Sequence, residues 1–229
     1  MNSRGRSDTI DSVAKNILQT PLINKKYILF GSITLFFLFG IFTLIVKSDR
    51  LMQFDFNTTV RLQDHIPQKY DVYLSVLSLI GSFEVLLVVL SGIMVLRRKL
   101  SGLYVIFIFV GIHLVEFIGK SFLHQPGTPF RFHRYAIDFI FPTSYVQPGS
   151  SYPSGHTMRT FFVATLLIIF FTTTRKMRHN TKIVLAIFLV LFAVAMAVSR
   201  VSLGEHWATD VIGGALLGTG SALFSLLLL

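Results

Sequence analysis

The chain has 229 residues, of which 52% are hydrophobic, 14% are charged and 23 are phenylalanine, with a mean hydropathy of +0.66. This composition excludes a soluble globular domain, and the absence of cysteine excludes disulfides, thiolate metal sites and cysteine nucleophiles. The formal net charge of +10 is spread between apolar runs, so we expect anionic lipid headgroups as partners and no nucleic acid.

Six apolar runs are each long enough to cross a bilayer. A hydrocarbon core about 30 Å thick needs roughly 20 apolar residues per helix, and a helix satisfies its own backbone hydrogen bonds there. We therefore predict an all-α polytopic membrane protein, with one six-transmembrane-helix bundle over residues 27–229. The predicted spans are 27–46, 73–96, 102–119, 157–174, 183–199 and 208–229, and the charged residues within them are Glu84, Glu116, Arg159 and Asp210.

Lysine and arginine gather before the first span, after the second and after the fourth. Because such residues mark the cytoplasmic side, both termini are predicted to be cytoplasmic, in a multi-pass protein of the plasma (cell) membrane. Residues 1–26 form a cytoplasmic segment whose apolar positions 10, 13, 17 and 18 fit either a short interfacial helix or a frayed tail. The segments 48–72, 120–156 and 200–207 then face outward.

One outward segment places His206 and Asp210 four residues apart at the start of the last span. This spacing puts both side chains on one helix face, where a carboxylate fixes the tautomer of an imidazole. Arg200 precedes them, and its forked guanidinium suits the oxygens of a phosphate. The alternative is a histidine and an aspartate that merely solvate a helix start.

The segment Pro153-Ser154-Gly155-His156 opens the fourth span. It combines a hydroxyl and a glycine amide at a helix N-terminus, where backbone N–H groups favour an anion, and it sets His156 beside that anion. An N-cap serine with a glycine in a turn is the alternative interpretation.

Lys120 ends the third span. Glu116 lies one turn earlier, where it can pair with the lysine and fix its ammonium group, and His113 lies one turn before that. The alternative is a lysine that extends to the interface and marks the end of the span. Glu84 has no partner evident in the sequence.

Together these residues resemble the type 2 phosphatidic acid phosphatase family, which is related in fold to vanadium haloperoxidases. Its second motif, Pro-Ser-Gly-His, matches residues 153–156, and its third, Ser-Arg, five residues, His, three residues, Asp, matches Ser199, Arg200, His206 and Asp210. Its first motif, Lys followed after six residues by Arg-Pro, is matched by Lys120 alone, because Gly127 stands at the arginine position. Candidates to replace that charge are Arg131 or Arg134, with His124 and the backbone amides around Gly127 as alternatives.

The resemblance implies a mechanism without a metal or other cofactor. His206 attacks phosphorus to form a phosphohistidine, Asp210 orients it, and His156 protonates the leaving group. The phosphate oxygens would be held by Lys120, Ser154, Gly155 and Arg200.

The resemblance also implies a membrane lipid phosphatase that hydrolyses a lipid phosphate or diphosphate at the extracytoplasmic face. Undecaprenyl pyrophosphate is the first choice of substrate, and a phosphatidylglycerophosphate or phosphatidic acid phosphatase is the alternative. A non-catalytic membrane protein that binds a lipid phosphate is a second class. A haloperoxidase is disfavoured because those relatives are soluble. The sequence indicates no particular oligomeric state.

Overall fold

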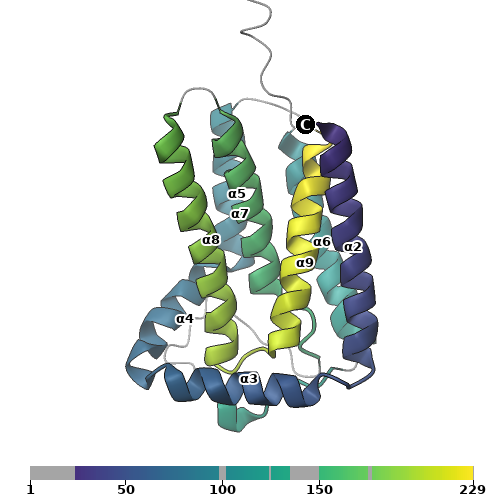
Figure 1. Ribbon diagram of the computed structural model, residues 1–229, viewed down its shortest axis with the longest axis vertical. Coiled ribbons are helices and arrows are strands. Elements are labelled where there is room, and N and C mark those ends of the chain that lie inside the picture. Colours follow the sequence, from purple (N-terminus) through teal and green to yellow (C-terminus); the bar gives the residue numbers. More distant parts are fainter. Residues whose placement is uncertain (1–23, 98–101, 124, 135–149, 175–176, 229) are drawn as a thin grey trace, which may run out of the picture.

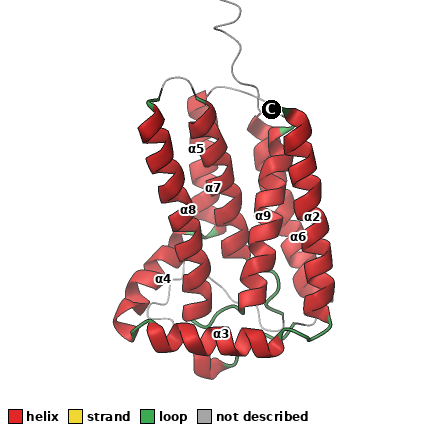
Figure 2. Cartoon of the chain, viewed as in Figure 1, coloured by secondary structure: helices red, strands yellow, loops and turns green. Residues whose placement is uncertain are grey.

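The computed structural model describes residues 24–97, 102–123, 125–134, 150–174 and 177–228, and these residues form helices joined by loops (Figure 2). Five of the helices are long and apolar enough to cross a membrane, or up to six spans result if one bent pair counts as one. The all-α, polytopic fold is therefore as predicted. The apolar positions 10–18, for which a short interfacial helix and a frayed tail were the alternatives, lie outside the described residues, which begin at position 24.

The five unbroken spans are α2 (Lys25–Lys47), α6 (Gly102–Phe122), α7 (Gly155–Thr173), α8 (His179–Ser202) and α9 (Ala208–Leu226). They stand side by side in one bundle (Figure 1). In the most apolar stretches of α7 and α9, the shares buried inside the protein are 50% and 61%. In the corresponding stretches of α2 and α8 the buried share is only 11%. Hence α7 and α9 form the centre, and the outer helices turn apolar faces toward lipid.

The second predicted span, 73–96, is broken into α4 (Asp71–Ile80) and α5 (Phe83–Arg97). The segments 68–80 and 83–93 meet at 50°. A break leaves carbonyl oxygens without helical partners, and here the buried Arg159 side chain of α7 donates from Nε to the Gly81 carbonyl at 3.3 Å. The sequence did not reveal this break because residues 73–96 form one continuous apolar run.

Between α2 and α4 lies a helix that hydropathy does not predict, α3 (Met52–His65), followed by the 3-10 turn η1 (Gln68–Tyr70). Its 14 residues are too few and too polar to span a bilayer. It lies across the end of the bundle at which α8 ends and α9 begins (Figure 1). A second 3-10 turn, η2 (Phe130–Phe132), follows α6.

Helices α7 and α9 approach each other closely because α9 presents glycines to α7. A side chain at Gly214 would place its Cβ 2.5 Å from the Ser154 carbonyl oxygen and 3.2 Å from the Met158 nitrogen. Their first turns therefore meet at one end of the bundle. Below that contact, Phe109, Met158 and Phe162 are fully buried in an apolar core shared with α5 and α6.

Candidate active site

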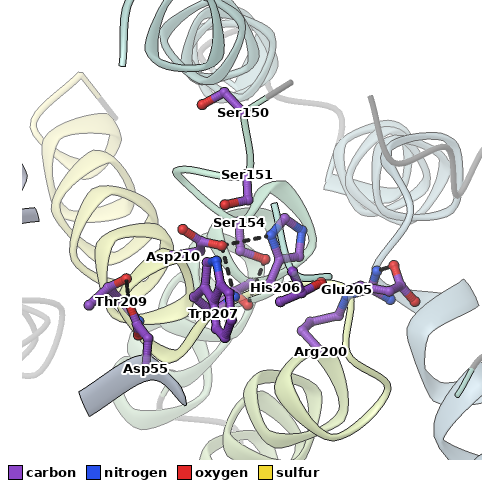
Figure 3. A network of polar contacts seen from close by, with 12 residues as sticks. Asp55, Ser150, Ser151, Ser154, Arg200, Glu205, His206, Trp207, Thr209 and Asp210 are labelled. Carbon is purple, nitrogen blue, oxygen red and sulfur yellow. Dashed lines mark hydrogen bonds and ion pairs between the residues drawn. The ribbon is translucent and has the colours of Figure 1, made fainter. Parts of the chain in front are cut away.

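The first turn of α9 fixes the His206 imidazole through Asp210 (Figure 3). Oδ2 of Asp210 lies 3.3 Å from Nδ1 of His206 and accepts the Trp207 backbone N–H at 2.9 Å. Asp210 is fully buried. Because a carboxylate only accepts, Nδ1 carries the hydrogen and Nε2 keeps its lone pair.

Burial also favours the neutral form of this histidine. Burial lowers the pKa of His206 below its ordinary value, although hydrogen bonding and charge from Asp210 act in the opposite direction. A neutral imidazole with Nε2 unprotonated is the form that acts as a nucleophile or a base.

A second imidazole, that of His156, occupies the first turn of α7. Its side chain is buried, and its Nε2 atom has no hydrogen-bond partner among the residues that the structure describes. Arg200, His206 and Lys120 all lie near enough to act on this imidazole electrostatically. A buried polar atom without a partner is costly unless a ligand satisfies it, so this atom points to a ligand site.

The second and third motifs are joined directly through the backbone. The Ser154 N–H donates to the Asp210 carbonyl oxygen at 3.0 Å, and the Ser154 hydroxyl accepts from Thr157 at 3.2 Å. Ser154 is fully buried beside the start of α7 (Figure 3). The positive end of the α7 dipole therefore lies at the two histidines, where it favours an anion.

Lys120 is held by the carboxylate expected from the spacing. Its Nζ lies 2.7 Å from Oε1 of Glu116, whose Oε2 contacts Arg159 and His113, each at 3.0 Å. A side chain on Gly155 would overlap this carboxylate, so Gly155 permits α6 to approach α7. Glu116 thus connects the first motif to the second.

Arg200 is fully buried at the end of α8 and forms an ion pair with Glu205 (Figure 3). It also donates to the Ser78 hydroxyl of α4. Sequence reasoning overlooked Glu205, although a carboxylate directly before the motif histidine was the available signal. The site therefore contains acidic as well as basic groups around the histidines.

The segment that follows α6 covers the loop that carries His206. Trp207 donates from Nε1 to the Pro126 carbonyl at 2.9 Å, and the Thr128 hydroxyl donates to the Gly204 carbonyl. Gly204 has a φ of +71°, and a Cβ there would overlap the backbone of Phe132. These contacts place the first-motif segment against the third motif.

Of the candidate replacements for the missing arginine, Arg134 is engaged elsewhere. Its Nε and Nη2 contact the Asp71 carboxylate at 3.0 and 2.8 Å, and its other bonds go to carbonyls at Gln63 and Ile66. Arg131 is exposed, with its guanidinium over the rings of Phe56 and Phe132 in α3 and η2. His124 lies outside the described residues.

Helix α3 contributes a residue that the sequence gave no reason to single out. Asp55 accepts the Thr209 backbone N–H at 2.8 Å and the Thr209 hydroxyl at 2.7 Å, which anchors the start of α9 (Figure 3). Burial raises the pKa of Asp55 to about 6. Asp55 thus supports the turn that positions Asp210.

The fold and the site together define an integral membrane protein with two histidines and several cations converging at one end of a helix bundle. The sequence model of the PAP2 superfamily matches residues 100–229. The chain therefore belongs to the PAP2 superfamily, whose members include membrane lipid phosphatases, and the resemblance drawn from its motifs is confirmed.

Two curated relatives are similar over part of their length. Phosphatidylglycerophosphatase B of Bacillus subtilis (strain 168) is 27% identical over 140 residues, which is 60% of this chain and 64% of the relative. The bacitracin transport permease protein BcrC of Bacillus licheniformis is 31% identical over 130 residues, which is 56% of this chain and 55% of the relative. Each match spans less than two thirds of the relative.

Two crystal structures share the fold. The transmembrane PAP2-type phosphatidylglycerolphosphate phosphatase from Bacillus subtilis has a TM-score of 0.66 at 22% identity, covering 86% of this chain and 94% of that one. Aquifex aeolicus LpxE has a TM-score of 0.57 at 22% identity, covering 76% of this chain and 94% of that one. These similarities extend the shared architecture beyond the matched motifs.

Proposed function

We propose that this chain is a lipid phosphatase that transfers the phosphate of its substrate to His206 before releasing it. Two imidazoles carry the proposal. One is oriented by a carboxylate, and the other has a buried nitrogen atom that makes no hydrogen bond within the described part of the chain. Asp210 fixes Nδ1 of His206 at 3.3 Å, while Nε2 of His156 is buried without a hydrogen-bond partner in the described part of the chain.

In the proposed reaction, Nε2 of His206 attacks phosphorus as the bond to the leaving oxygen breaks. His156 donates a proton to that oxygen, so the lipid leaves as an alcohol or, from a diphosphate, as a lipid monophosphate. His156 then takes a proton from water, which attacks the phosphohistidine and releases inorganic phosphate.

Charge that develops on the phosphoryl oxygens needs fixed donors. Lys120, Arg200, the Ser154 hydroxyl and the backbone amide of Gly155 are the groups we assign to these oxygens. Such donors cost little reorganisation in a buried site and can each supply several kcal/mol of transition-state stabilisation.

Two lipid substrates are candidates. Undecaprenyl pyrophosphate is the choice made from the sequence, and phosphatidylglycerophosphate is favoured by the name of the 27%-identical Bacillus subtilis relative. For either, we propose a plasma-membrane location with the site facing outward. Support for this orientation comes from Lys25, Lys26, Arg178 and Lys182, which lie at the opposite end of the bundle from the histidines.

The test is phosphate release by the full chain in detergent with excess chelator, from undecaprenyl pyrophosphate, phosphatidylglycerophosphate and phosphatidic acid. We expect release that is lost in His206→Asn. It should persist in His179→Asn, a matched control because His179 is exposed where α8 begins, at the other end. If the wild-type protein is folded and binds these lipids but releases no phosphate, it would instead be a lipid-phosphate-binding protein. The missing first-motif arginine is the observation that favours this alternative.

A further inference from the structure

The first motif lacks its arginine, yet a different arginine lies buried beside its lysine. We propose that Arg159 is a positioning residue that restores the charge balance of the phosphate site, because it offsets the Glu116 carboxylate that contacts Lys120 and the charge of Glu84. This inference rests on the proposed function, since it concerns how the same site binds phosphate.

Arg159 lies one turn after His156 on α7, and the residue is only 5% exposed. Its Nη1 lies 3.0 Å from Oε2 of Glu116, and the other oxygen of that carboxylate lies 2.7 Å from Nζ of Lys120. Arg159 therefore reaches Lys120 through one shared carboxylate. Its Nε donates to the Gly81 carbonyl at 3.3 Å, which anchors the guanidinium.

The charges of Lys120, Arg159 and the two nearby carboxylates balance one another. Glu116 alone would form a neutral pair with Lys120, and Glu84 also acts electrostatically on Arg159. The two carboxylates and the two cations sum to zero. Without Arg159 the same cluster carries one negative charge beside the place where a phosphate anion must bind.

The residues near the first motif offer no equivalent cation in the described part of the chain. Gly127 occupies the arginine position of the family, and a Cβ added there meets no atom within 4 Å. Arg134 is committed to Asp71, and Arg131 is exposed over aromatic rings. By contrast, Arg159 acts electrostatically on His156, as Lys120 and Arg200 do.

The experiment measures the affinity for inorganic phosphate through Trp207, the single tryptophan of the chain and the neighbour of His206. Its fluorescence reports occupancy of the site without requiring turnover. We expect Arg159→Gln to raise the Kd for phosphate on the order of tenfold, because one favourable charge is lost at close range. Arg159→Lys keeps the charge and should bind phosphate nearly as wild type does. Lys182→Gln, which removes a cation at the opposite end of the bundle, is the matched control.

The decisive comparison adds Glu116→Gln to Arg159→Gln. The double variant returns the cluster to zero net charge, so its Kd should fall back toward the wild-type value. A purely structural role for Arg159 predicts the opposite, because a second polar contact has been removed. A Kd for Arg159→Gln equal to that of wild type, or a double variant that binds no better than Arg159→Gln, overturns the inference.

Failure of this inference and failure of the proposed function are separable. If wild type releases phosphate from lipids while Arg159→Gln binds phosphate normally, only the role of Arg159 is wrong. If wild type binds phosphate with the expected dependence on residue 159 but releases none, the charge balance holds and the hydrolase assignment fails.

Discussion

The contact between Asp55 and Thr209 predicts a specific difference between two substitutions. Asp55 is 2% exposed and accepts both the backbone N–H and the hydroxyl of Thr209. Asp55→Ala leaves both groups without this acceptor, which costs about 2 kcal/mol of unfolding free energy. Asp55→Asn keeps an acceptor for the N–H and offers an amide donor to the hydroxyl, so it should be far less damaging.

The pH dependence has a definite sign. Burial raises the pKa of Asp55 from 3.8 to about 6, so the folded protein holds this proton more tightly than the unfolded chain. The resulting stabilisation is complete below the unfolded value, near pH 4, and is lost as pH rises through about 6. A pKa shift of this size corresponds to a change of about 3 kcal/mol in the free energy of unfolding.

The assay is the free energy of unfolding of purified protein in mixed micelles between pH 4 and 7. Wild type should lose up to about 3 kcal/mol relative to Asp55→Asn across this range, since all other groups are shared. Two results would refute the reasoning: a constant difference between these two proteins from pH 4 to 7, or Asp55→Asn as unstable as Asp55→Ala at pH 7.

Three further substitutions test separate contacts. Gly213→Ala would place a Cβ 2.5 Å from the Tyr152 ring and should lower the unfolding free energy by about 1–3 kcal/mol in the same assay. Arg134→Gln breaks a mostly buried ion pair, so we expect a loss of about 3 kcal/mol in stability with an unchanged phosphate Kd, whereas a direct phosphate ligand would show the reverse. Glu205→Gln removes the carboxylate paired with Arg200 and should tighten phosphate binding about tenfold; weaker binding would contradict this.

The spans and the motif pairs were predictable because both depend on local rules. Hydropathy over about 20 residues locates α2, α6, α7, α8 and α9, since a bilayer demands continuous apolar helices. The spacing of four residues likewise predicts the Glu116–Lys120 pair, which lies on one face of α6, and the His206–Asp210 pair, which forms although His206 lies just before the first turn of α9.

What could not be predicted depends on which helix ends meet. Helix α3 is polar and short, and its place is decided by Asp55, whose partner Thr209 lies 154 residues away. The break at Gly81 is stabilised by Arg159 from another helix, so no local pattern reveals it. The same holds for Arg134, which a motif comparison offers as a phosphate ligand but whose guanidinium pairs with a carboxylate of α4.

The most direct test of the account is to trap the proposed phosphoenzyme. Wild type and His206→Asn would be mixed with lipid substrate carrying a radiolabelled terminal phosphate and quenched in alkali within milliseconds. We expect an acid-labile, alkali-stable label on the peptide that contains His206, chased into inorganic phosphate and absent from His206→Asn. Full turnover by wild type without any protein-bound label, or label that persists in His206→Asn, would contradict the central claim.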